Sequence, residues 1–405
     1  MIISCNGSAD AADRYLKAQT AASLPYAIVD TGQTSCHDDL VEIACGERWA
    51  GQDAQHDGHR PSYADHGDGT VTDLVTGLMW QKTVGSKATW YDAVDGARAV
   101  RIAGYDDWRL PTIKELYALI DFSGSSFVTA STSVPYIDTE YFDFEYGDTS
   151  SGERFIDAQF WSSTRYVGTT MNGDATAFGV NFADGRIKGY PTDTGTGGAP
   201  FTAFVRYVRG GSGYGENDYV DNGDGTVTDG ATGLMWTRAD SGIPMDWREA
   251  LEYAESFEWG GYDDWRLPNA KELQSIVDYS RAPDATDAGS RGAAIDQIFD
   301  LTEEESWFWS STTHLDGPDA RWAVYVTFGR ATGWMEQPPG SGRYVLLDVH
   351  GAGSQRSDPK TGDPTDYPNG HGPQGDVVRV ENFVRLVRDA WENEDDSRRR
   401  TVRRR

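Results

Sequence analysis

The sequence predicts an α+β protein made of two tandem copies of one domain, and two observations support this prediction. Four sequence blocks occur twice along the 405 residues, in the same order. The chain also contains 46 glycines, and its apolar runs are short and bounded by turn residues, as in antiparallel strands. We therefore expect each copy to pack two helices on short antiparallel strands, with copy 1 at 61–212 and copy 2 at 213–391.

The four blocks are too long to recur by chance, so both copies are expected to share one fold. Eight of the 14 tryptophans fall at matched positions of the two copies, which is typical of core residues. In copy 1 the blocks read GDGTVTDLVTGLMW (67–80), GYDDWRLP (104–111), FWSST (160–164) and FVRYVR (204–209). In copy 2 they read GDGTVTDGATGLMW (223–236), GYDDWRLP (261–268), FWSST (308–312) and FVRLVR (383–388).

Two helices are expected in each copy. Directly after the second block, Thr112 and Glu115 have the spacing of a capping box, and Asn269 and Glu272 have it in copy 2. Apolar residues at helical spacing also predict an earlier amphipathic helix in each copy, at 90–100 and 247–254.

The last block is expected to form a buried strand that holds an inward-facing arginine. Arg206 and Arg209 lie an odd number of positions apart, so they face opposite sides of a strand. A buried guanidinium needs a partner, and Asp106 or Asp107 is the expected carboxylate. We interpret this pair as a structural clamp, with ligand binding as the alternative.

The composition limits the classes of partner. The formal net charge is −28, from 64 acidic and 36 basic residues. Such a field repels nucleic acid and sulfated polyanions, which leaves neutral carbohydrate, peptide or another envelope protein. No apolar run approaches the ~18 residues that a membrane-spanning helix needs.

The cysteines indicate an extracytoplasmic protein, in the periplasm or at the cell surface. Cys36 and Cys45 bracket a short polar stretch and are expected to form a disulfide, which requires an oxidising compartment. Two unrelated thiols are the alternative, and a zinc site is disfavoured because no CxxC pair is present.

Both ends of the chain are expected to lie outside the repeated domains. Residues 2–5 resemble the end of a lipoprotein signal, so Cys5 is a candidate for lipidation if an apolar segment precedes it. We interpret 1–60 as a leader that carries this possible lipid anchor and the disulfide loop. The basic tail at 392–405 is expected to be disordered, and it would contact anionic lipid or the acidic surface of the protein.

The repeated blocks resemble the Lcl C-terminal domain family, named for the C-terminal domain of the Legionella collagen-like adhesin. The resemblance covers 61–210 and 215–390. It implies C-type-lectin-like domains, a fold related to formylglycine-generating enzymes, and no catalytic residues. The adhesin's own domain is associated with trimerisation and with sulfated glycosaminoglycans. Here glycine has no every-third-residue period and the net charge is strongly acidic, so neither property is expected to transfer.

The resemblance and the residues together favour a non-catalytic, adhesin-like binding protein of a bacterial envelope. An envelope enzyme related to formylglycine-generating enzymes is one alternative, but its chemistry uses cysteines within the domain and neither copy contains one. Ser162 and Ser163 recur as Ser310 and Ser311, which favours strand packing over nucleophilic catalysis. Sixty-four acidic residues leave glycoside hydrolysis as a further enzymatic possibility. A purely structural interaction module is the other alternative.

The metal requirement is left open by the sequence. In 221–225, glycines stand where a calcium-binding loop needs oxygen ligands, so tight turns are the preferred interpretation. No cofactor is expected, with calcium as the alternative.

Both copies share the core blocks, so a specific function is expected where the copies differ. We therefore expect the ligand site in copy 2. Only copy 2 has the long stretch 333–377, whereas copy 1 crosses the equivalent gap at 185–203. Long loops on a rigid scaffold are common recognition sites, and aromatic rings there would stack on a sugar or another ligand. The candidate ligand-binding residues are Trp322, Trp334, Tyr344, Asp348, His350, Arg356, Asp358, Tyr367 and His371.

Overall fold

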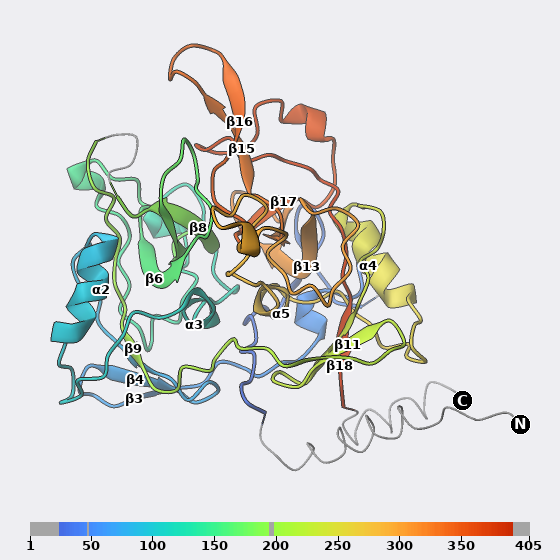
Figure 1. Cartoon of the computed structure of the whole chain (residues 1–405), viewed down its shortest axis with the longest axis horizontal. Helices are drawn as coiled ribbons and strands as arrows, with labels where there is room; N and C mark the ends of the chain where they lie inside the picture. Colours follow the sequence, from blue (N-terminus) through green and yellow to red (C-terminus); the bar gives the residue numbers. More distant parts are fainter. Residues whose placement is uncertain (1–23, 47, 194–197, 392–405) are drawn as a thin grey trace, which may run out of the picture.

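Both copies fold into the same order of strands and helices in the computed structural model, which describes residues 24–46, 48–193 and 198–391 (Figure 1). Copy 1 contains β3 (Tyr63–Asp65), β4 (Thr70–Asp73), β5 (Met79–Gln81), α2 (Trp90–Ala99), α3 (Ile113–Ala118), β6 (Gln159–Arg165), β7 (Thr176–Asn181), β8 (Arg186–Pro191) and β9 (Val208–Arg209). Copy 2 repeats them as β10 (Tyr219–Asp221), β11 (Thr226–Asp229), β12 (Leu234–Thr237), α4 (Trp247–Ser256), α5 (Ala270–Ser275), β13 (Trp307–His314), β14 (Trp322–Thr327), β17 (Gln355–Pro359) and β18 (Val387–Asp389).

The remaining elements are short. The leader has β1 (Cys36–His37), β2 (Glu42–Ile43) and η1 (Asp53–Gln55), and copy 2 has the extra hairpin β15 (Thr332–Glu336) and β16 (Tyr344–Asp348). Single 3-10 turns are η2 (Ala130–Thr132), η3 (Thr149–Ser151), η4 (Ala288–Ser290) and η5 (Pro364–Asp366).

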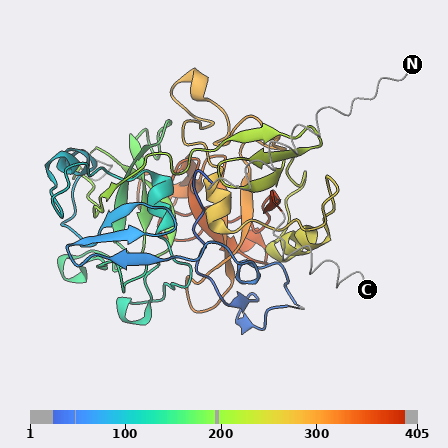
Figure 2. The same cartoon turned by 90° about the horizontal axis from the view of Figure 1, so that it is seen from below.

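The two copies share one central sheet. Its strand order is β13-β14-β17-β8-β7-β6, so three strands of copy 2 continue directly into three of copy 1. The junction is antiparallel, with Gln355 opposite Ile187, and the order reads the same from either edge. The copies are therefore related by an approximate two-fold axis. The β3-β4-β5-β9 sheet of copy 1 and the β10-β11-β12-β18 sheet of copy 2 lie on opposite sides of the molecule (Figures 1 and 2).

Two repeated lysines tie the copies together at the short helices. Helices α3 and α5 contact each other and pack on the central sheet. The Lys114 ammonium of α3 donates to the carbonyl of Ser275, the last residue of α5, at 2.7 Å. The Lys271 ammonium of α5 donates to the carbonyl of Ala118, the last residue of α3, at 2.9 Å. Each lysine thus satisfies the open carbonyl end of the other copy's helix.

The expected helix starts are confirmed. Thr112 and Glu115 form a capping box at α3, and Asn269 and Glu272 form one at α5. In each copy the arginine of the DWRLP block also donates two hydrogen bonds to this glutamate. In copy 2 both bonds, from Arg266 to the two carboxylate oxygens of Glu272, are 2.6 Å long. The eight matched tryptophans are all buried, with at most 9% exposure, as their matched positions predict.

The arginine prediction was half right. Arg206 is fully buried, but its guanidinium donates to the backbone carbonyls of Gln81, Lys82 and Asp143 instead of to a carboxylate. These carbonyls lie at the end of strand β5 and in the loop that holds Asp143, so backbone oxygens satisfy two of the three guanidinium nitrogens, while the buried Nε has no partner among the described residues. The expected partner Asp107 binds Arg209 on the outer side of the strand, at 2.7 Å.

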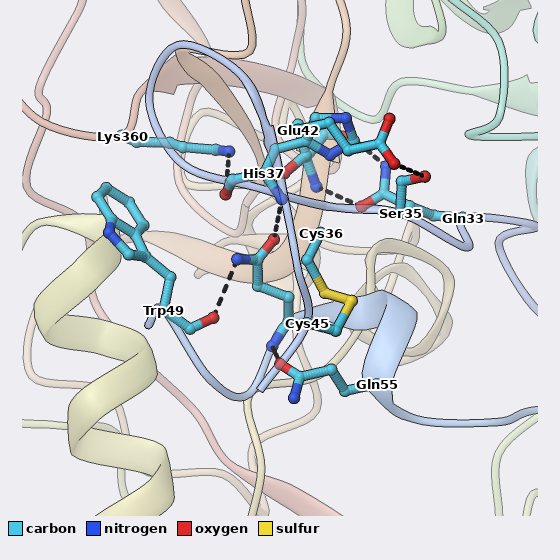
Figure 3. The surroundings of a disulfide bond; sticks show 11 residues. Gln33, Ser35, Cys36, His37, Glu42, Cys45, Trp49, Gln55 and Lys360 are labelled. Carbon is cyan, nitrogen blue, oxygen red and sulfur yellow. Dashed lines mark hydrogen bonds between the residues drawn. A yellow bond between two sulfur atoms is a disulfide. The ribbon is translucent and has the colours of Figure 1, made fainter. Parts of the chain in front are cut away.

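The leader packs between the copies and crosses several elements of copy 2. Gln33 exchanges two hydrogen bonds with the backbone of Thr313, at 2.8 and 2.9 Å. Figure 3 shows the Cys36–Cys45 disulfide beside the buried Lys360, whose ammonium donates to the carbonyl of His37. The expected disulfide is confirmed, and its loop contributes to the contact with β17 and the segment after it.

Removing this disulfide is expected to lower the free energy of unfolding. Replacing both Cys36 and Cys45 by alanine should cost about 2–3 kcal/mol, because the cross-link restricts a short loop in the unfolded chain. Urea unfolding of the wild type and the double variant would measure the difference. A difference that persists when both proteins are unfolded in reductant would contradict this origin of the stabilisation.

The α+β class is confirmed, since short helices pack on sheets in which all named strand pairs are antiparallel. The C-type-lectin-like fold that the family resemblance implies stays a prediction.

Cys5 and the basic tail lie outside the described residues. Within the described ranges no helix has the length and apolar character needed to span a membrane.

Candidate functional site

Copy 2 departs from the shared pattern between β14 and β17. In copy 1, β8 follows β7 after the turn at 182–185, whereas in copy 2 the hairpin β15–β16 intervenes before β17 takes the matching place in the sheet. The hairpin projects from the molecule above β17 (Figure 1). The segment 360–376 then returns to it, where the Trp334 amide donates to the carbonyl of Gly375 at 2.7 Å. We call these two segments the rim; the described part of copy 1 has no strands between β7 and β8 that match the hairpin.

Three of the predicted residues form an aromatic cluster under this rim. The rings of Trp322 and His371 lie 4.6 Å apart between centroids, and Tyr367 lies 6.4 Å from Trp322. Trp322 is buried in the sheet, Tyr367 is half-buried and His371 is exposed. The cluster therefore anchors segment 360–376 and leaves its outer rings accessible.

Two further predicted residues share one partly buried carboxylate. His350 Nε2 lies 2.8 Å from one oxygen of Asp376, and the Arg356 guanidinium binds the other. Burial first, and then the charge of Arg356, lowers the pKa of His350 well below its usual value. The ring is therefore neutral, and because the carboxylate accepts, Nε2 carries the proton.

His350 and Arg356 lie next to charged residues on strand β8 of copy 1. On β8, Lys188 binds Asp184 at 2.8 Å, and Arg186 contacts both Asp184 and Asp316. Arg186 and Arg356 stand on neighbouring strands of the junction. Arg356 Nε and Nη1 have no hydrogen-bond partner among the described residues, although both are buried. The junction thus concentrates charges of both signs in the interior.

The two predicted aspartates hold structure elsewhere. Asp348 accepts hydrogen bonds from the Gly351 amide and from the Tyr166 hydroxyl of copy 1, and burial raises its pKa to about 7. Asp358 accepts from the amides of Arg379 and Val380, which fixes the turn that leads to β18.

Four of the nine predicted residues are accessible to a ligand. Trp334 and Tyr344 stand on the hairpin, and Tyr367 and His371 on segment 360–376. The other five are buried, because their partners come from distant parts of the chain. Sequence reasoning missed Asp376, which joins His350 to Arg356, and no spacing in the sequence indicates that contact.

The repeated aspartates form turns. Asp65 accepts from the Gly67 amide at 2.9 Å, and Asp68 accepts from the amide and hydroxyl of Thr70. The part of the chain that the structure describes contains no group of three or more His, Cys, Asp or Glu side chains arranged to hold a metal ion.

The fold and the rim define a two-copy α+β protein with accessible aromatic side chains on a projection of its second copy. A scan against family models matches the Lcl C-terminal domain at residues 69–209 and 225–346. The chain therefore belongs to the Lcl C-terminal domain family, in two tandem copies. The family is associated with adhesins, which indicates binding at an extracellular surface.

The second match ends within β16, so it does not include β17 and β18. The structure nevertheless places both strands where β8 and β9 stand in copy 1. Searches of curated proteins and of solved structures returned no match to this chain.

Proposed function

We propose that the protein is a non-catalytic surface-binding protein of a bacterial envelope that recognises neutral carbohydrate through copy 2. The observation that carries the proposal is the rim of hairpin β15–β16 and segment 360–376, because it presents aromatic side chains and its hairpin has no counterpart in the described part of copy 1. Aromatic faces with polar groups nearby suit sugar rings, and the net charge of −28 disfavours sulfated ones.

The shared serines support binding over catalysis. The Ser162 hydroxyl donates to the Phe178 carbonyl at 2.7 Å, and the Ser310 hydroxyl donates to the Val324 carbonyl at 2.9 Å. A hydroxyl held between two strands in this way has no adjacent base and is not placed for attack on a substrate.

A glycan array would identify the ligand, and a point variant would test the site. Replacing Tyr344 by alanine is expected to weaken glycan binding by about 1 kcal/mol or more, because a stacking ring is lost from an exposed position. Calorimetric titration with the best array ligand would measure the change.

Tyr91 provides a matched control in copy 1. It is exposed to 46%, against 42% for Tyr344, and stands on helix α2 far along the chain from the rim. Tyr91→Ala should leave binding unchanged. Equal losses for the two variants, or no glycan binding by the wild type, would reject the rim as a carbohydrate site.

A further inference from the structure

Copy 2 contains a cleft of about 270 Å³ between helix α4 and the adjoining ends of strands β11 and β12. Its walls include three aromatic side chains, Tyr253, Phe257 and Trp259. The Trp259 indole is 49% exposed, and its N–H donates to the Asp224 carbonyl at 3.1 Å, which fixes the ring at the mouth. Gly225 permits this position, because a Cβ there would lie 2.8 Å from the indole nitrogen.

The cleft depends on residues that copy 1 lacks. The repeat places Gly96, Val100 and Ile102 of copy 1 where copy 2 has its three aromatic residues. In copy 1 the Tyr207 hydroxyl reaches the Ala93 carbonyl at 2.9 Å, and a Cβ on Gly96 would lie 2.5 Å from it. Copy 2 has the shorter Leu386 at the position of Tyr207, so the strand leaves space beneath the helix. Both changes together form the cleft.

The charge of the cleft is negative. Asp240, Asp300 and Arg238 line the cleft, and Arg238 binds Asp300 at 3.2 Å and Asp221, which lies outside the lining, at 2.9 Å. The nearby Arg385 is fully buried and donates to three backbone carbonyls. The lining itself thus carries two carboxylates and one guanidinium group. Asp240 is a feature of copy 2, since Val84 holds its position in copy 1.

The polar groups of the cleft are already engaged with one another. One Asp240 oxygen accepts from the Gly242 amide and the Thr302 hydroxyl, and the other accepts from the Thr302 amide. Arg238 forms ion pairs with two aspartates, although its buried Nε has no hydrogen-bond partner among the described residues. A ligand that depends on hydrogen bonds, such as a sugar or a primary amine, would have to compete for these groups. A ligand that needs only negative potential and aromatic faces would not.

We infer that this cleft binds a quaternary ammonium group. The methyl groups of such a cation cannot donate conventional hydrogen bonds, and they pack on aromatic faces while nearby carboxylates balance the charge. The net charge of −28 favours the approach of a cation. This inference does not depend on the carbohydrate rim, which is built from different residues.

Choline and its neutral isostere dimethylbutanol, in which carbon replaces the nitrogen, test the inference on the full chain. Calorimetric or fluorescence titration should show saturable choline binding, and the isostere should bind roughly tenfold more weakly. Trp259→Ile, which introduces the copy 1 residue, and Asp240→Asn should each weaken choline binding roughly tenfold. Tyr344→Ala, on the rim, should leave it unchanged.

Each other result would overturn the inference. Equal affinity for choline and the isostere would show an apolar site without selectivity for charge. Binding of glucose but not choline, lost in Trp259→Ile, would show a sugar site. The absence of saturable choline binding by the wild type would reject a cation site outright. Thermal unfolding of each variant would confirm that it is folded. Asp240→Asn removes a charge but leaves the aromatic walls unchanged, so it tests the inference independently of the loss of the Trp259 ring.

Discussion

Replacing Glu272 by alanine is expected to lower the free energy of unfolding by about 3–5 kcal/mol. The Glu272 carboxylate accepts two hydrogen bonds from the guanidinium of Arg266, and both side chains are at most 13% exposed. It also accepts from the amide of Asn269, which closes the capping box of α5. The substitution removes the cap and leaves a buried arginine without its main partner, which is the costlier effect.

Glu249 offers a matched control, because it is the glutamate of the capping box at α4 but stands exposed. Glu249→Ala should cost only about 0.5–1 kcal/mol, the value of a cap alone. Urea unfolding followed by circular dichroism would give both values. If the two variants lose equal stability, the buried ion pair contributes nothing beyond the cap.

Features set by neighbouring residues could be predicted from the sequence. Thr112 with Glu115, and Cys36 with Cys45, lie close enough along the chain for spacing to define the contact. The repeated blocks likewise identified the shared core, because identical residues in both copies must satisfy the same packing. Strand alternation predicted that one of Arg206 and Arg209 faces inward, but neither the choice of Arg206 nor its carbonyl partners followed from it, since these come from strand β5 and a distant loop.

The packing of the two copies against each other could not be predicted from the spacing of residues. The lysine of the repeated KEL sequence reads as a helix-surface residue, and only the approximate two-fold axis brings Lys114 and Lys271 to the end of the opposite helix. The sequence did not indicate how the leader packs, yet Gln33 pairs with Thr313 across most of the chain. Such contacts leave no periodic signal in the sequence.

The candidate site was likewise predictable where the sequence alone shows the feature, and unpredictable where distant residues meet. The long segment of copy 2 was evident from its length, and two of its rings, those of Tyr367 and His371, do lie beside Trp322 of β14. Burial of His350 and Arg356 was not evident, because no spacing in the sequence pairs them with Asp376 at the far end of the same segment, and the flanking charges on β8 belong to copy 1. The cleft beside Trp259 went unnoticed, although comparing Gly96 with Tyr253 and Tyr207 with Leu386 between the copies would have indicated it.

The leader also carries a carboxyl group whose titration should be measurable in the stability of the whole protein. Asp53 is fully buried and accepts hydrogen bonds from the hydroxyls of Thr31 and Thr312, at 2.8 and 2.6 Å. Desolvation raises its pKa from 3.8 to about 7, against the lowering effect of these two hydrogen bonds. The protonated form is therefore favoured in the folded state, and its contribution to stability is lost as the pH rises through about 7.

Asp53→Asn removes this titration, so the comparison with wild type isolates it. As the pH falls from 8 to 5, the difference in free energy of unfolding should move in favour of the wild type by about 2–3 kcal/mol. The comparison with the wild type is needed because His56 also titrates. Burial lowers the pKa of His56 to about 4, so below its usual pKa this residue reduces stability as the pH falls, which is opposite to the effect of Asp53. Asp57→Asn, an exposed change in the same leader, should show no such trend. Urea unfolding at pH 5, 6, 7 and 8 would decide the matter, since a difference that is constant with pH would mean that Asp53 is ionised throughout this range.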